Sequence, residues 1–230
     1  MEEEYFCPIC NEEMFISQSE ASCIYCGIKA KEDYVCGKGH YICEKCRIAN
    51  PKELIFNTCK ISKEKNPLKL AILLMKHPGV SMHGLEHHYI VGCTFLAVLK
   101  NLGIFNVSPE DFDKVVARAA RIPYGACGSW GACGAAISAG IAFSVASKAN
   151  MLSKNERSNA LTIVSKALME IAKLNGPRCC KASVFLTLIK ALKFINELYK
   201  LNCDVNENYI CEFSKRNKDC LKERCPFYGK

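Results

Sequence analysis

The sequence predicts a mainly α-helical protein: a helical bundle that is preceded by a small treble-knuckle module and followed by an irregular Cys-rich tail. Cysteine pairs crowd the first 50 residues, apolar residues recur at helical spacing from residue 67 onward, and the end of the chain is polar and again rich in cysteine. These changes divide the 230 residues into a module over 1–50, a connector over 51–66, a helical domain over 67–202 and a tail over 203–230 that packs on the helical domain.

Cysteine is the most unusual feature of the composition, with 17 residues in a chain that is otherwise ordinary for a globular protein. Many of these cysteines form Cys-x-x-Cys pairs, and the first residues are acidic, whereas a secretion signal is basic and then apolar. We therefore expect a cytoplasmic protein whose reduced thiols serve as ligands or reagents. The longest apolar stretch, residues 135–146, is shorter than the roughly 20 residues that cross a bilayer, so we expect a buried helix and no membrane contact. The net charge of +8 is spread along the chain, which permits an anionic partner without requiring one.

An all-α body is predicted to begin at Pro67, where apolar residues recur at spacings of three and four until His77-Pro78-Gly79 interrupts the pattern. The further predicted helices cover residues 85–102, 108–121, 134–148, 153–174 and 180–201. Two of these helix starts carry capping signals: Ser108 is followed by a proline and two acidic residues, and Ser153 with Glu156 forms a capping box. The body is therefore expected to be a bundle of about six helices.

Eight residues of the N-terminal module are candidate metal ligands: Cys7, Cys10, Cys23, Cys26, Cys36, His40, Cys43 and Cys46. A Cys-x-x-Cys pair grips one ion from a tight turn, as tetrahedral zinc requires, so eight ligands predict two Zn²⁺ ions. The last two pairs lie too close in sequence to share one ion comfortably. We therefore favour a cross-brace, with Cys7, Cys10, Cys36 and His40 on one zinc and Cys23, Cys26, Cys43 and Cys46 on the other; a sequential arrangement is the alternative. The spacing resembles RING- and ribbon-type knuckles, which implies a structural or docking module that metal binding folds.

The segment from Met82 to His88 contains three of the five histidines in the chain. His83 and His87 are four residues apart and share one helical face, where two imidazoles can bind one metal ion. Glu86 lies where a general base could act, and the His-x-x-Glu-His order matches that of inverted zinc peptidases. A metal-dependent hydrolase is therefore one alternative, with Glu170 as a candidate third ligand. Histidines that are hydrogen-bonded within a helix interface are the other.

A glycine-rich loop, residues 122–135, holds Cys127 and Cys133 at the start of a predicted helix. A helix N-terminus lowers the pKa of a thiol and favours the reactive thiolate, so both cysteines are candidate catalytic residues. Trp130 lies between them and offers a stacking surface for a substrate. A helix start that is packed tightly by small residues is the alternative.

Two adjacent cysteines, Cys179 and Cys180, open the last predicted helix between Arg178 and Lys181. Their position beside cations and at a helix N-terminus predicts nucleophilic or metal-binding thiols. Arg178 would then hold an anionic substrate. Buried inert thiols and a strained vicinal disulfide are the alternatives.

The tail supplies Cys211, Cys220 and a Cys225-Pro226 pair, a pattern similar to irregular ligation of a [4Fe–4S] cluster. Cys203, Cys179 or Cys180 could supply the fourth thiolate, and zinc is the competing metal. We take Cys203, Cys211, Cys220 and Cys225 as the predicted ligands of this third centre.

Three motifs, His-Pro-Gly-Val-Ser-Met-His-Gly-Leu-Glu-His-His, Cys-Gly-Ser-Trp-Gly-Ala-Cys-Gly-Ala and Gly-Pro-Arg-Cys-Cys-Lys, resemble an uncharacterised cysteine-rich family of methanogenic archaea and anaerobic bacteria. This resemblance implies no particular activity. More remotely, Cys93 and the Cys133-to-Gly140 segment are similar to the redox-active Cys-Gly-Ala-x-x-Gly proteins. This second resemblance implies late cysteines on a helical body and, in some relatives, electron-transfer centres.

Two hypotheses for function follow. In the first, the chain is an anaerobic redox or sulfur-handling enzyme in which the four cysteines of the helical domain, at 127, 133, 179 and 180, meet His83 and His87 at one Fe–S or thiol site. Glu86 or a histidine would move protons, Trp130 and His88 would contact the substrate, and a protein would exchange electrons or sulfur. In the second, a non-catalytic accessory protein docks a partner enzyme or a nucleic acid through its zinc module. No glycine-rich loop has strand-to-helix context, so nucleotide binding of the Walker or Rossmann type is not indicated.

Overall fold

The N-terminal module is built from very short elements. Strand β1 pairs antiparallel with β4, and β2 pairs antiparallel with β3. The elements are β1 Met14–Ser17, β2 Ala21–Ser22, β3 Lys29–Ala30, β4 Asp33–Cys36 and helix α1 Glu44–Arg47. Strands of two to four residues make few ladder hydrogen bonds, so this secondary structure contributes little stability by itself. The computed structural model describes residues 5–205 and 207–229, so the acidic start of the chain, Glu2 to Glu4, lies outside it.

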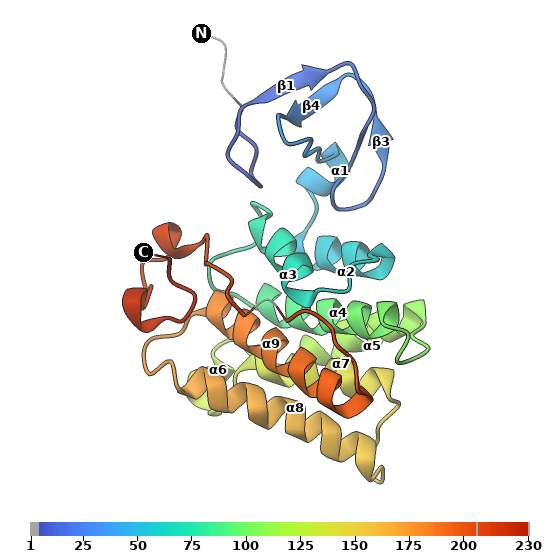
Figure 1. Cartoon of the computed structure of the whole chain (residues 1–230), viewed down its shortest axis with the longest axis vertical. Helices are drawn as coiled ribbons and strands as arrows, with labels where there is room; N and C mark the ends of the chain where they lie inside the picture. The colour runs from blue at the N-terminus through green and yellow to red at the C-terminus, as the bar shows by residue number, and fades with distance from the viewer. Residues whose placement is uncertain (1–4, 206, 230) are drawn as a thin grey trace.

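The module rests on the helical body near the end of α3 (Figure 1). The Tyr25 hydroxyl, on a side chain that is only 2% exposed, donates a hydrogen bond of 3.2 Å to the carbonyl of Leu73. The buried His77 Nε2 donates to the carbonyl of Cys46 at 2.9 Å. The rings of Tyr25 and His77 meet edge to face, with centroids 5.5 Å apart. The module and the body are therefore joined by buried polar contacts.

The body is a helical bundle, as predicted (Figure 1). Its helices are α2 Pro51–Ile61, α3 Pro67–Lys76, α4 Glu86–Asn101, α5 Pro109–Ala119, α6 Ala126–Ser129, α7 Gly134–Ala146, α8 Asn155–Ala172 and α9 Cys180–Tyr199. Helices α4 and α7 form the centre: α4 packs on α2, α3, α5, α7 and α9, while α7 packs on α4, α5, α8 and α9. Helix α7 is buried on nearly every side, as its apolar sequence predicted. Within the part that the structure describes, no helix is long and apolar enough to cross a membrane.

The connector predicted over 51–66 is wrong, because it contains helix α2 of the body. The Asn50 side chain accepts a hydrogen bond from the backbone N–H of Lys52 at 2.9 Å, and Pro51 occupies the first turn. Leu54, Ile55 and Cys59 of this helix are fully or almost fully buried. An Asn-Pro pair starts α3 in the same way, with Asn66 as the N-cap and Pro67 in the first turn.

The two predicted capping signals have different outcomes. At α5 the Asp111 side chain accepts a hydrogen bond from the Ser108 backbone N–H at 3.0 Å, which confirms that helix start. At α8 the predicted capping box is wrong, because the helix begins later, at Asn155. The Ser153 hydroxyl accepts instead from the Asn150 N–H at 3.0 Å within the preceding turn.

The tail turns back at the end of α9 and runs along this helix toward its first residues (Figure 1). Two 3₁₀ turns, at Ser214–Arg216 and Lys222–Arg224, are its regular elements among the described residues. The Phe185 ring of α9, with no exposed surface, meets the rings of Tyr209, Phe213 and Phe227 at centroid distances of 4.9, 6.5 and 5.2 Å. The tail is therefore held on the first half of α9.

Candidate functional site

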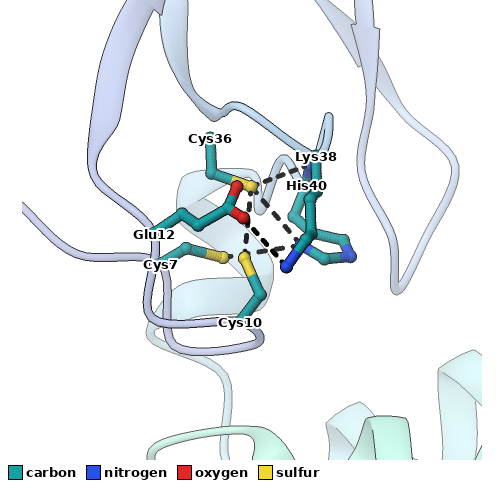
Figure 2. Close-up of polar contacts among 6 residues, drawn as sticks. All are labelled: Cys7, Cys10, Glu12, Cys36, Lys38 and His40. Atoms are coloured by element: carbon teal, nitrogen blue, oxygen red, sulfur yellow. Dashed lines mark hydrogen bonds and ion pairs between the residues drawn. The ribbon is translucent and has the colours of Figure 1, made fainter.

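The first cluster that could hold a metal ion consists of Cys7, Cys10, Cys36 and His40, whose side chains converge in Figure 2. Its four ligand atoms all lie within 4.8 Å of one another. The Cys10 and Cys36 sulfurs are 3.6 Å apart, and His40 Nδ1 is 3.7 Å from Cys7 Sγ and 3.4 Å from Cys36 Sγ. Bond lengths of about 2.3 Å to sulfur and 2.0–2.1 Å to nitrogen in a tetrahedral site give separations of about 3.8 and 3.6 Å. The cluster therefore fits one four-coordinate ion.

The second cluster consists of Cys23, Cys26, Cys43 and Cys46, again with every ligand atom within 4.8 Å of the others. The Cys26 and Cys43 sulfurs are 3.6 Å apart. The ligands of the two clusters alternate in pairs along the chain, so the favoured cross-brace grouping is confirmed and the sequential one is wrong.

A tight turn follows four of the eight ligands. The backbone N–H two positions after the cysteine donates to its sulfur at Cys7, Cys23, Cys26 and Cys36. Burial still raises the pKa of Cys7 to about 11, whereas at Cys23 the N–H donors from Cys43 and Cys26 outweigh burial and lower the pKa to about 7. Since several thiolates cannot share a buried site without a cation, these turns and the clustering favour a bound metal ion.

A cavity of about 540 Å³ lies among α4, the loop before α7 and the start of α9. We call it the thiol cavity, because it brings together predicted residues that are far apart in sequence: Cys127, Cys133, Cys179, Cys180, Arg178, His87 and His88. The start of α7 contributes Cys133, the N-cap residue, and the start of α9 contributes Cys179 and Cys180, its N-cap and first residues. Trp130 is not among the lining residues and is 63% exposed, so it does not form the expected stacking surface within the cavity.

The two thiols at the start of α9 are less acidic than predicted. Burial raises the pKa of both Cys179 and Cys180, and this outweighs the N–H donors that favour their thiolates. Negative charge on Cys133, which lines the same cavity, also raises the pKa of Cys180. Cys179 and Cys180 are free thiols, with no vicinal disulfide between them. Arg178 lies over the Tyr124 ring, 4.9 Å from its centroid, at the edge of the cavity.

The histidines of the predicted His-x-x-Glu-His site diverge. His87, 1% exposed, hydrogen-bonds through Nδ1 to the Gly84 carbonyl at 3.1 Å, so Nδ1 carries the proton and Nε2 has no partner among the described residues. Burial lowers the pKa of His87 well below its usual value, which leaves a neutral ring at the thiol cavity. His83 faces the tail instead, where its Nε2 donates to Asn217 Oδ1 at 3.1 Å. Glu86 accepts a hydrogen bond of 3.1 Å from Ser81.

These three side chains therefore do not surround one metal ion in the described structure, and the site expected for a hydrolase is not formed. The third candidate ligand, Glu170, is occupied elsewhere, in ion pairs with Lys173 at 2.9 Å and Lys190 at 3.4 Å.

The tail cysteines border a different, smaller cavity, which we call the tail cavity. Four cysteines line it: Cys179, Cys211, Cys220 and Cys225. Burial is the main reason that the pKa of Cys211 rises to about 11, and charges on the other three thiols raise it further. Cys203, predicted as a ligand with the tail cysteines, lies beyond the other end of α9, where its backbone exchanges hydrogen bonds with the Asn196 side chain. Cys179 takes its place.

Two residues of the tail cavity were missed from the sequence. Asn217, 7% exposed, donates from Nδ2 to Cys179 Sγ at 3.5 Å while its Oδ1 accepts from His83. Lys181, 1% exposed, donates to the carbonyl of Ser81 at 3.0 Å, and burial lowers its pKa to about 8. The position of Lys181 directly after Cys180 was visible in the sequence, but its burial was not.

Gly134 provides a local test of the thiol cavity. A β-carbon at this position would lie 2.2 Å from His88 Nε2, so Gly134→Ala must displace the half-buried ring. We expect the free energy of unfolding to fall by about 1–3 kcal/mol, as in other overpacked sites. Gly128→Ala is the matched control, since a β-carbon there meets nothing within 4 Å. Urea unfolding of both variants measures the difference; equal stability would contradict the packing of His88 on Gly134.

Comparisons with other proteins identify a family to which the chain belongs, but they identify no activity. No curated protein and no solved structure matches the chain. A family model described as "Family of unknown function (DUF5714)" matches residues 55–228, which include both cavities and all the motifs of the helical body and tail. The match excludes the two N-terminal clusters and covers most of the 230 residues. The chain therefore belongs to this family of unknown function, DUF5714.

Proposed function

We propose that this chain is a thiol-dependent redox or sulfur-handling protein and that the thiol cavity is its active site. One observation carries the proposal: Cys127, Cys133, Cys179 and Cys180, from two distant loops, line a single cavity with Arg178 and a neutral His87. Structural cysteines pack in cores, as Cys59 and Cys93 do here with no exposed surface. Thiols that gather around a cavity beside a cation and a proton acceptor are instead suited to chemistry.

The proposed chemistry centres on Cys133 and Cys180. When two thiols join as a disulfide they release two electrons and two protons, which a bound substrate accepts; an external dithiol then restores the pair by exchange. His87 is neutral and its Nε2 has no partner among the described residues, so in this proposal that nitrogen accepts the proton of a cavity thiol. Arg178 gives the cavity a positive edge, which favours an anionic substrate. In the sulfur-handling form, one of these thiolates attacks the outer sulfur of a donor such as thiosulfate; the S–S bond of the donor breaks, sulfite leaves, and the cysteine becomes a persulfide.

We further propose that both N-terminal clusters hold Zn²⁺ in a structural role. The support is the two ligand sets: three cysteines with one histidine in the first cluster, and four cysteines in the second. The sulfur–sulfur distance of 3.6 Å in each cluster fits a closed tetrahedral site. The carbonyl of Cys46, a ligand of the second cluster, accepts a hydrogen bond from His77 of the body, which suits a structural module. Docking of a partner enzyme or nucleic acid through this module stays a prediction.

Controlled oxidation tests the thiol site. Full-length protein, reduced under anaerobic conditions, is treated with the thiol oxidant diamide, alkylated and mapped by mass spectrometry. We expect the loss of about two free thiols per chain and a disulfide that joins Cys133 to Cys180. Cys180→Ser should abolish this disulfide, while Cys93→Ser, a change in the core outside the cavity, should leave it intact.

The anion expected at Arg178 gives a second measurement. Thiosulfate should slow alkylation of Cys180 in the native chain and should not do so in Arg178→Leu. Unchanged oxidation of Cys180→Ser, together with alkylation that thiosulfate never slows, would contradict an active site at this cavity.

A further inference from the structure

The turns at the tail cysteines repeat the local geometry of the N-terminal metal ligands. Cys211 accepts a hydrogen bond from the backbone N–H of Phe213, Cys220 from Lys222 at 3.4 Å and Cys225 from Phe227. In each case the donor lies two positions after the cysteine, as at four ligands of the N-terminal clusters: Cys7, Cys23, Cys26 and Cys36. Such donors stabilise the thiolate, which is the form that binds metal.

Three other cysteines of the body, Cys59, Cys93 and Cys180, lack this turn. In the described part of the chain, the core thiols of Cys59 and Cys93 have no backbone N–H donor, and Cys180 takes its donor from the distant Gly84.

The fourth cysteine of the tail cavity, Cys179, has two kinds of donor: the Ala182 N–H in the first turn of α9 and the Asn217 side chain at 3.5 Å. All four sulfurs of the tail cavity therefore receive N–H groups.

The four thiols are too widely spaced to match the ligands of a single tetrahedral ion. One zinc draws its thiolates to about 3.8 Å from one another, and both N-terminal clusters have their ligand atoms within 4.8 Å. Among the described residues, no three ligands of the tail cavity meet that limit; the four cysteines instead enclose a common space. A cubane cluster requires this wider arrangement, because a core of iron and sulfide separates its four thiolates.

The surroundings also suit a large anionic cofactor. The walls between the cysteines are apolar, with Phe185, Phe213 and Phe227 among them. Lys181 adds a buried amine to the same cavity, 5.0 Å from the centroid of the Phe213 ring. A [4Fe–4S] core with four thiolates carries net negative charge, and a buried cation in an apolar wall stabilises it more than a solvated one would.

We infer that the tail cavity binds a [4Fe–4S] cluster through Cys179, Cys211, Cys220 and Cys225. Because Cys179 lines both cavities, the cluster would lie directly beside the thiols of the proposed active site. The inference goes beyond the proposed function: it holds whether or not Cys133 and Cys180 react.

The test is anaerobic purification of the full chain, followed by iron and acid-labile sulfide analysis, visible absorption and EPR of the dithionite-reduced protein. We expect about four iron and four sulfide per chain and a reducible cluster signal. Cys211→Ser and Cys220→Ser should each lose most of the iron. Cys203→Ser and Cys180→Ser are matched controls that should keep it, because Cys203 lies at the far end of α9 and Cys180 lines only the thiol cavity.

A variant that keeps all four ligands guards against loss of iron by misfolding. Asn217→Ala should retain the cluster and shift its reduction potential to more negative values, because an N–H···S hydrogen bond favours the reduced, more negatively charged form. A third equivalent of zinc in place of iron, or iron that depends on Cys203 rather than on Cys211, would overturn the inference. So would an unchanged potential in Asn217→Ala.

Discussion

Removal of metal from the N-terminal module is expected to unfold residues 5–50 and to leave the helical body folded. The module has strands of only two to four residues and one four-residue helix, so its chain entropy is not offset by secondary structure. Binding of a structural zinc ion supplies about 10–16 kcal/mol in knuckles of this kind. The binding free energy that is lost with even one ion is therefore larger than the stability that the remaining contacts of the module can provide. The body keeps its own core around α4 and α7.

Chelation and one ligand variant measure this effect. We expect about two zinc ions per chain in the native protein. After chelation, or in Cys23→Ser, we expect rapid proteolysis within residues 5–50 and a resistant fragment that begins near α2. Cys203→Ser, which changes a cysteine outside both clusters, should keep its zinc and its protection. A chelated protein whose module still resists protease would show that metal does not fold it.

Replacement of Phe185 by alanine is expected to cost about 3–5 kcal/mol of unfolding free energy, the range for a fully buried aromatic side chain. The loss should be concentrated in the tail, because the Phe185 ring contacts three aromatic rings there: Tyr209, Phe213 and Phe227. Without it, the segment that carries Cys211, Cys220 and Cys225 loses its main apolar support on α9. Release of the tail should also release the cofactor that we assign to it.

Denaturant unfolding and limited proteolysis of Phe185→Ala provide the measurement, with iron content as a second readout. Leu198→Ala is the matched control on the same helix, since Leu198 is 38% exposed and should cost far less. The packing described here would be contradicted if Phe185→Ala lost less than about 1 kcal/mol and its tail stayed protected.

The sequence was sufficient wherever a local pattern carries its own physical constraint. The eight ligands of the module and their cross-brace grouping follow from Cys-x-x-Cys spacing, because the chain between Cys36 and Cys46 is too short for both pairs to close on one ion. The long helices α3, α4, α5, α7, α8 and α9 follow from apolar periodicity and capping signals, whereas the short α6 was predicted as part of a glycine-rich loop. That Cys127 and Cys133 meet Cys180 was a hypothesis about tertiary structure that no local pattern required; in the structure, all three line the thiol cavity.

Errors arose where two local patterns were equally good. Pro51 and Pro67 follow asparagines that cap helices, yet the first was taken as part of a connector. Ser153 had the spacing of a capping box, but its hydroxyl bonds to Asn150 in a turn that the spacing does not reveal.

Tertiary structure alone decided the groupings that depend on distance along a helix or on burial. Helix α9 has 20 residues, so its ends are about 30 Å apart, and the return path of the tail places Cys211, Cys220 and Cys225 beside Cys179 rather than beside Cys203. Adjacent residues of a helix point in different directions, so Cys180 lines only the thiol cavity while Cys179 also reaches the tail cavity. Burial then reversed the expected pKa shift of both thiols, because the cost of desolvating a thiolate exceeds the benefit of a helix N-terminus.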